Sequence, residues 1–345
     1  KGYGILRMDN LQGGFAFDDD LKYAPINEEV FDKYKLQKND VLFNRVNSEE
    51  FVGRTGIYKL SGNHVFASYL VRCQTKENEL LPDYLNIFLN TKYGILSIRR
   101  MSRRAVNQAN VNAQELKAIK IPLPPLMFQE EIRNLLEKSH ELFEKSKILY
   151  SQAEVLLLSE LDIKDIDLFH EPCYVVDSAY TISVNRIDAE YYQPKYEKIV
   201  NTIKKYFGGF SFVKYEFVQV KDSFLKDNSK FYRYVEIGGI DISYGNIECL
   251  NLKGDKLPTN AKIITQGGEL IISKVRPTRG AVTIIPEDWK EVICSGAFAV
   301  LKENGLIRKE VLNVFLKSII GKELLGRPVT GTSYPTVDDK DVLEL

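Results

Sequence analysis

The feature of this sequence that most restricts its fold is an internal repeat. Two segments recur 229 residues later: Ile5–Leu11 aligns with Tyr234–Ile240, and Asp40–Val46 aligns with Glu269–Val275. The offset then falls to 227 residues for Tyr84–Asn86 and Val311–Asn313, and to 226 residues for Asn110–Asn112 and Thr336–Asp338. Because so small a drift over so many positions is not a chance match, the chain contains a tandem duplication.

Each copy has the pattern of a mainly β domain. Short β-branched runs alternate with turns, and the third predicted strand spans His64–Cys73 in the first copy and Val292–Leu301 in the second. One amphipathic helix follows, over Pro82–Leu96 and Lys309–Leu325. The sequence therefore predicts an α+β fold: two tandem-repeated, mainly β domains with one packed helix each, separated by a long helix of the coiled-coil type.

The segment between the copies predicts that separating helix. Ile121–Leu126 is rich in proline and cannot be helical, since a proline disfavours the α region for the residue before it. Beyond it, apolar or small residues recur at alternating steps of four and three, the pattern of a coiled-coil seam. A helix from Leu126 to Leu161 would be about 54 Å long. We predict that one leucine stripe of this helix binds a partner: Leu135, Leu142, Leu149 and Leu156.

The charges follow the same division of the chain. Residues 1–120 carry 18 basic and 14 acidic side chains, residues 121–193 carry 6 and 14, and residues 194–345 carry 23 and 19. A single-site nucleic-acid-binding protein usually shows one basic face, so two basic blocks on an acidic spacer suggest two contact modules held apart; a solvated, Glu-rich helix gives the same acidic balance. We predict four parts: the first copy (1–120), the proline stretch and spacer helix (121–165), a connector (166–193) and the second copy (194–345).

The sequence lacks the motifs of several enzyme classes. Neither G-x-G-x-x-G nor G-x-x-x-x-G-K-[ST] occurs, and the N-P-P-Y signature of amino-methyltransferases is absent. The histidines show no H-E-x-x-H spacing and the 4 cysteines form no C-x-x-C pair, so we expect no metal, no cofactor and no catalytic residue. No apolar run approaches the ~20 residues of a membrane span, and widely spaced cysteines suit a reducing compartment. We expect a cytoplasmic protein.

One catalytic alternative can be assembled from the residues. Pro82–Asp83 with Glu115 and Lys117 can be read as the P-D…E-x-K pattern of a nuclease. Glu115, however, stands where both copies have a carboxylate that begins a helix, and such a carboxylate stabilises the helix dipole. We therefore expect no catalysis within this chain.

Several motifs together carry a family resemblance. They are the Ile121–Leu126 stretch with Gln129 and Ile132, the preceding Gln108–Val111 turn, and the Asp40–Arg45 strand followed by Val52–Thr55. With the repeat, they resemble the specificity subunit of type I restriction-modification systems over nearly the whole chain. The sequence departs from the family at Met127–Phe128, where acidic residues are usual, and at both ends. We expect the first copy to lack about 45 residues at its start and the second its final proline stretch and helix.

The resemblance implies a DNA reader without catalysis. In this family each repeat is a target recognition domain that reads half of a split double-stranded DNA target. The helices set the gap between the halves and dock methyltransferase subunits and the restriction-translocase subunits. An alternative is the recognition part of a fused single-chain restriction-methyltransferase, which the sequence upstream of Lys1 would reveal. A purely structural or protein-interaction module would instead bind no DNA at any salt concentration.

The loops of both copies supply candidate DNA-binding residues. In the first copy these are Asn44, Arg45, Arg54 and Thr55 after two strands, the cluster Arg99, Arg100, Arg103 and Arg104, and then Gln108 and Asn110. In the second copy they are Lys274, Arg276, Thr278 and Arg279, followed by Arg327, Thr332, Ser333 and Tyr334. Arginine can bridge guanine, and glutamine or asparagine can bridge adenine, in the major groove. The same arginines could equally hold phosphates, which receive most protein–DNA hydrogen bonds.

Overall fold

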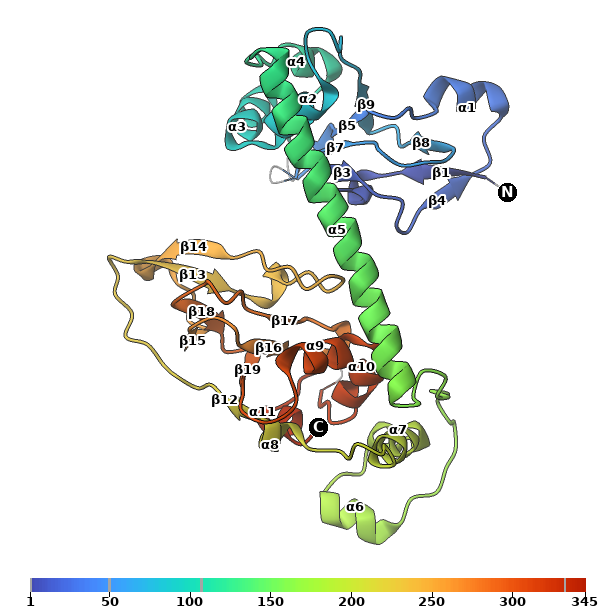
Figure 1. Ribbon diagram of the computed structural model, residues 1–345, viewed down its shortest axis with the longest axis vertical. Helices are drawn as coiled ribbons and strands as arrows, with labels where there is room; N and C mark the ends of the chain where they lie inside the picture. Colours follow the sequence, from blue (N-terminus) through green and yellow to red (C-terminus); the bar gives the residue numbers. More distant parts are fainter. Residues whose placement is uncertain (1, 49–50, 106–107, 332) are drawn as a thin grey trace. The chain divides into compact units, whose positions relative to one another are not determined.

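A computed structural model describes residues 2–48, 51–105, 108–331 and 333–345. The chain divides into two compact units, unit 1 (Lys1–Glu144) and unit 2 (Lys145–Leu345). The boundary falls inside the long helix α5 (Leu126–Glu160), which is continuous (Figure 1). The observed helix ends one residue before the end that the sequence predicts. The four-part division of the chain stays a prediction.

Unit 1 consists of short strands and helices before α5. In chain order they are β1 (Tyr3–Leu6), η1 (Met8–Asn10, a 3-10 helix), β2 (Leu11–Gln12), β3 (Phe15–Ala16), β4 (Lys22–Ala24), α1 (Glu28–Tyr34), β5 (Val41–Asn44), β6 (Val46–Asn47), β7 (Thr55–Ile57), β8 (His64–Phe66), β9 (Leu70–Cys73), α2 (Pro82–Asn90), α3 (Lys92–Met101), β10 (Arg103–Ala105), β11 (Gln108–Asn110) and α4 (Ala113–Lys117).

Unit 2 repeats much of this order after a helical connector. Its elements after α5 are α6 (Ser178–Val184), η2 (Ala189–Tyr192), α7 (Pro194–Lys204), α8 (Val213–Glu216), β12 (Phe217–Gln219), β13 (Phe231–Val235), η3 (Ile237–Gly239), β14 (Leu250–Lys253), η4 (Gly254–Lys256), β15 (Ala261–Thr265), β16 (Leu270–Ser273), η5 (Pro277–Arg279), β17 (Val282–Ile284), β18 (Val292–Ser295), β19 (Phe298–Glu303), α9 (Lys309–Lys317), α10 (Ile319–Gly326) and α11 (Asp339–Leu343).

The two copies share the central strand pairings of two sheets and differ in the outer strands, such as β15 beside β18 in the second copy. In the first, β1 pairs antiparallel with β4 and parallel with β8; in the second, β13 pairs antiparallel with β14 and parallel with β18. A second sheet in each copy places one strand between two antiparallel neighbours, β5 between β7 and β9, and β16 between β17 and β19. The α+β duplication that the sequence predicts is therefore confirmed in the pairing of the strands.

The central strands β5 and β16 are buried on both faces. Leu42 and Phe43 belong to different core clusters, as successive residues of a strand must when both faces are covered. Ile271 and Ile272 of β16 divide between two clusters in the same way. This burial explains why both segments are continuous apolar runs instead of alternating ones.

The acidic residue before each central strand closes a turn. The Asp40 carboxylate accepts a hydrogen bond from the Gln37 N–H at 2.8 Å, and the Glu269 carboxylate accepts one from the Gln266 N–H at 3.0 Å. Both carboxylates are buried, whereas Gln37 and Gln266 are exposed at the other end of their turns. A charged carboxylate is a strong acceptor for a backbone N–H, so each of these hydrogen bonds holds its turn against the buried start of the strand. The repeat has kept this role while exchanging Asp for Glu.

Two sequence predictions about the elements are wrong in detail. The strands predicted over His64–Cys73 and Val292–Leu301 are each two strands, because β8 and β18 join one sheet while β9 and β19 join the other. The single helix predicted in each copy is also two helices, α2 with α3 and α9 with α10. In each copy, one predicted strand and one predicted helix are therefore each divided in two at a change of chain direction that the apolar periodicity does not show.

The corner between the two helices has a local cause. Thr91 and Ser318 leave the helical conformation, and their hydroxyl oxygens accept hydrogen bonds from the N–H groups of Gly94 and Gly321 at 3.2 and 3.1 Å. Such N-caps start a new helix. At each glycine an added Cβ would collide with the backbone carbonyl of the preceding helix. Glycine therefore permits the close approach of the two helices.

We expect Gly94→Ala and Gly321→Ala each to lower the free energy of unfolding by about 1–3 kcal/mol, because the new methyl group has no room beside the backbone. Urea denaturation followed by circular dichroism measures the change. Gly238→Ala is the control, since its Cβ would meet nothing closer than the Glu236 carboxylate at 3.9 Å. Equal midpoints for Gly94→Ala and Gly238→Ala would contradict this account of the corner.

Candidate nucleic-acid interface

Each copy carries a paired loop next to its second sheet. In the first copy β10 and β11 form a hairpin, and β11 pairs with β6 through Asn110 and Val46. In the second copy Thr336 pairs with Val275 and with Thr330. These pairings are related by the offsets found in the sequence, so the two loops are equivalent positions of the repeat. We name them the first loop (residues 102–110) and the second loop (residues 327–336).

The first loop presents mixed polar side chains. Asn110 and Arg103 are exposed, and the Arg103 guanidinium donates to the Glu115 carboxylate at 2.8 Å. Glu115 also accepts from the Asn112 N–H at 2.8 Å in a capping box, and this hydrogen bond lowers the pKa of the Glu115 carboxyl, with a smaller contribution from Arg103. Arg104 and Gln108 lie in β10 and β11, and their side chains are outside the described part of the chain.

The other first-copy candidates differ in accessibility. Arg100 is exposed and Arg99 half-buried on α3, Arg45 is half-buried, and Arg54 is exposed with its guanidinium 4.7 Å from the ring centre of Phe51. Two candidates are fully buried instead. Asn44 ends β5, and the hydroxyl of Thr55 donates to the Gly53 carbonyl at 2.8 Å. Because both side chains are buried, we leave Asn44 and Thr55 out of the proposed DNA contacts.

The second loop offers different chemistry from the first. Ser333 and Tyr334 are exposed, and the Arg276 guanidinium lies 5.9 Å from the Tyr334 ring centre. Thr278 and Arg279 are exposed on the neighbouring turn. Thr332 lies outside the described residues.

Two cations of the second copy are already engaged within it. Lys274 pairs with Asp339 at 2.8 Å. The Arg327 guanidinium donates to the Tyr191 carbonyl and to the Tyr180 hydroxyl, both at 3.2 Å. Arg327 thus already makes two hydrogen bonds inside unit 2, and we leave it out of the proposed DNA contacts.

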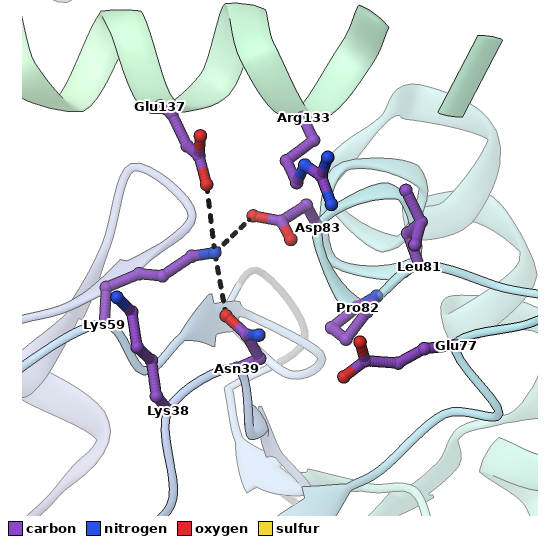
Figure 2. Close-up of a pocket in the computed structure, with 9 residues that line it drawn as sticks. All are labelled: Lys38, Asn39, Lys59, Glu77, Leu81, Pro82, Asp83, Arg133 and Glu137. Carbon is purple, nitrogen blue, oxygen red and sulfur yellow. Dashed lines mark hydrogen bonds and ion pairs between the residues drawn. The ribbon is translucent and has the colours of Figure 1, made fainter. Parts of the chain in front are cut away.

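A polar pocket of about 300 Å³ lies in unit 1, next to α5 (Figure 2). Its central Lys59 ammonium lies 2.8 Å from a carboxylate oxygen of Asp83, 2.9 Å from the amide oxygen of Asn39 and 3.6 Å from a carboxylate oxygen of Glu137. Asp83 is buried on α2 and Glu137 lies on α5, so this network ties the first copy to the helix. Since Asp83 pairs with Lys59 and Glu115 caps α4, the two carboxylates of the nuclease pattern have structural partners.

Gln129 provides a second tie at the start of α5. It is fully buried, its amide oxygen accepts from the Leu81 N–H at 2.9 Å, and its amide nitrogen donates to the Pro124 and Glu79 carbonyls at 2.9 and 3.1 Å. Leu81 precedes α2, so one side chain satisfies a backbone donor at the start of that helix and the carbonyl that leads into α5. The sequence shows Gln129 only as part of a motif. Its hydrogen bonds show that it joins the start of α5 to the start of α2.

The outer face of α5 carries the predicted leucine stripe. Leu135, Leu142, Leu149 and Leu156 are 67%, 57%, 53% and 71% exposed. The neighbouring stripe is covered: Leu136 is buried in the core of unit 1, and Tyr150 packs within unit 2. Exposed leucines at heptad spacing along a helix are typical of a surface that binds another helix.

A buried lysine joins the second copy to α5 within unit 2. Lys317 is only 7% exposed, and its ammonium lies 5.4 Å from the ring centre of Tyr150. Burial lowers the pKa of Lys317 to about 8; Asp241 opposes this shift and Lys322 adds to it. Burial also raises the pKa of the Tyr150 hydroxyl. The protonated form of Lys317 therefore lowers the free energy of unfolding.

The sign of the pH effect follows from this lowered pKa. Below about pH 8 Lys317 is protonated in both states and the penalty is complete; above it the folded state loses the proton first, so stability rises with pH. We expect the urea midpoint of unit 2 to rise between about pH 8 and pH 10.

Lys317→Met should abolish this rise in stability and should stabilise the protein near neutral pH by about 1–3 kcal/mol. The exposed Lys302→Met is the control and should keep the rise. A flat profile for the unmodified protein would contradict the prediction.

Among the described residues, no group of three or more His, Cys, Asp or Glu side chains is arranged to hold a metal ion. Within the same residues, no helix combines the length and the apolar character that crossing a membrane requires.

Comparison with known proteins gives matches to one family. Residues 2–155 match the family described as type I restriction modification DNA specificity domain. Over 139 residues, 39% of this chain and 32% of the relative, the sequence is 34% identical to the putative type I restriction enzyme MjaX specificity subunit of Methanocaldococcus jannaschii. Over 140 residues, 40% of this chain and 30% of the relative, it is 28% identical to the type I restriction enzyme EcoKI specificity subunit of Escherichia coli K12. The chain thus spans about a third of the length of these curated relatives.

Solved structures align over the whole chain at low similarity. The HsdS subunit from Thermoanaerobacter tengcongensis shares 11% identity at a TM-score of 0.31, with 100% of this chain and 78% of that chain covered. The S subunit of a type I restriction-modification system from M. genitalium shares 13% identity at a TM-score of 0.33, with 99% and 76% covered.

Proposed function

Since residues 2–155 match the DNA specificity domain of type I restriction-modification systems, we propose that the chain acts as a specificity subunit and that each of its two copies reads one half of a split, double-stranded DNA target. The observation that carries this proposal is the equivalence of the two loops. Each loop pairs with the same position of the repeat, Val46 in the first copy and Val275 in the second, yet one presents Arg103 and Asn110 and the other presents Ser333 and Tyr334. Equivalent frameworks with different side chains are what two readers of different sequences require.

The arginines have a separate role in the proposal. Arg54 and Arg100 in the first copy, and Arg279 in the second, are exposed beside their loops and can neutralise phosphates. Arg45, Arg99 and Arg276 are half-buried and can add single donors to the backbone. Phosphate contacts fix the position of the duplex, and the loop side chains then meet base edges.

The long helix serves assembly in this proposal. The leucine stripe of α5 binds a partner helix, and the helix sets the distance between the half-sites and docks methyltransferase subunits. Restriction-translocase subunits complete the cytoplasmic complex and perform the chemistry, while this chain contributes no catalytic residue. The exposed stripe and the polar ties of Gln129 and Lys59 support a rigid role for the helix.

The assignment of one copy to one half-site can be tested on the intact complex. Methylome sequencing of a strain carrying the system first gives the split target. We then expect Asn110→Ala to cost about 1–3 kcal/mol of binding on the cognate target, with the loss confined to one half of it, because an amide that bridges a base reads only that base. Tyr334→Ala should weaken discrimination in the other half. Binding is measured on duplexes altered in one half at a time.

Arg100→Ala is the matched control for phosphate contact. It should weaken binding to all duplexes alike and lower the magnitude of the salt slope by about one. An equal loss in both halves for Asn110→Ala would contradict the assignment of one copy to one half-site.

The stripe on α5 predicts assembly through apolar contacts. We expect Leu142→Glu to weaken association of the specificity subunit with its partners by at least about tenfold, since a buried carboxylate in a helix seam loses its hydration. Analytical ultracentrifugation of the mixed subunits measures this. Glu141→Gln, one residue away, is the control. Undiminished assembly with Leu142→Glu would exclude the stripe as the docking surface.

A further inference from the structure

A side chain from the connector reaches the base of the second loop. The Arg186 guanidinium donates to the carbonyls of Pro328 and Val329 at 2.8 and 3.0 Å, across 142 and 143 residues of sequence. The same guanidinium donates to both carboxylate oxygens of Asp188, at 2.9 and 2.7 Å. Arg186 thus holds two consecutive carbonyls of the second loop while Asp188 fixes its orientation.

An aromatic ring completes the arrangement. The guanidinium of Arg186 lies 4.4 Å from the ring centre of Tyr191, and that of Arg327 lies 4.7 Å from the same ring. The Tyr192 hydroxyl donates to the Arg186 carbonyl at 2.8 Å. Planar guanidinium groups stack on aromatic faces in a way that a lysine ammonium cannot copy. We call Arg186, Asp188, Tyr191 and Arg327 the connector clamp.

The connector clamp holds the N-terminal end of the second loop. Pro328 and Val329 directly precede Thr330, whose N–H and carbonyl pair with Thr336 at 2.9 and 3.0 Å. The pairing of Thr336 with Val275 holds the C-terminal end of the loop. Between these two ends, Ser333 and Tyr334 are exposed at the tip of the loop. The direction in which this tip projects therefore depends on the carbonyls that Arg186 holds.

The side chain of Arg186 is itself withdrawn from solvent. It is 19% exposed, and its guanidinium donates hydrogen bonds to Asp188 and to the loop backbone. Hydrogen bonding to Asp188 is the main cause of a raised pKa for Arg186, and the same bond lowers the pKa of the Asp188 carboxyl. Both groups stay charged throughout the physiological range, so the clamp does not depend on pH there.

We infer that Arg186 is a positioning residue for DNA recognition: through the backbone of Pro328 and Val329 it sets the conformation of the second loop, and so controls discrimination in the second half-site without contacting DNA. This inference rests on the proposed function. It assigns to the connector of residues 166–193 a share in the specificity of the second loop.

The test uses Arg186→Lys in the intact complex. Lysine keeps the charge but cannot serve the carboxylate and both carbonyls at once, since its donors form no planar fork. We expect discrimination between the cognate target and duplexes altered in the second half to fall by at least about tenfold, the equivalent of one lost charge-assisted hydrogen bond. Discrimination in the first half should change by less than about twofold.

The control is Arg308→Lys. Arg308 is an exposed arginine of the same unit that pairs with Glu303 at 3.2 Å, and its substitution should leave discrimination in both halves unchanged. Thermal unfolding of each variant shows whether the unit is folded. If Arg186→Lys does not fold, the isosteric Asp188→Asn replaces it, with the same selective loss expected.

The outcomes separate this inference from the proposed function. If Tyr334→Ala is selective for one half and Arg186→Lys leaves discrimination intact, the connector clamp is structural only and the inference fails. An equal loss in both halves for Arg186→Lys also overturns it. If neither Asn110→Ala nor Tyr334→Ala is selective for a half, the proposed function itself fails.

Discussion

The structure depends on how one helix divides its surface. Successive residues of a helix point in different directions, so a face that packs on a domain cannot also face a partner. In α5 one stripe is used for packing, with Leu136 buried in unit 1 and Tyr150 packed in unit 2. The leucines one position before these, Leu135 and Leu149, remain exposed. The heptad pattern of α5 thus describes two surfaces, one internal and one available.

Polar groups decide where the domains attach to this helix. Lys59 joins Asp83 and Glu137 in unit 1, and Gln129 satisfies backbone groups on both sides of the same joint. Apolar contacts alone could slide along a helix, because they have little directional preference. Hydrogen bonds and ion pairs of fixed geometry select one register, since a shifted register would leave buried polar groups unpaired.

Much of the framework could be predicted from the sequence because it is encoded locally. The repeat and the long helix from Leu126 both follow from patterns within short segments. The corner at Thr91 was missed, since the apolar period continues across it and only the Thr–Gly pair marks the break. The burial of Asn44 and Thr55, two candidates for DNA binding, cannot be predicted, because polarity alone does not show that a strand end is buried.

The contacts of the candidate interface were less predictable because they join distant segments. The sequence predicts that Arg327 is a loop cation available to DNA. In the structure its guanidinium donates hydrogen bonds to Tyr180 and Tyr191, which lie more than a hundred residues earlier in the chain. No local pattern contains such a pairing.

The connector clamp has a consequence for exchanging modules between proteins of this kind. A recognition loop that is held only by its own copy can be transplanted with that copy. The second loop is held by residues 186–191, which precede α7 and the sheets of the second copy. A graft that begins at Pro194 would therefore separate the loop from its support, whereas a graft that begins at Asn185 would carry both. In this chain the portable unit of recognition is larger than the folded copy that displays it.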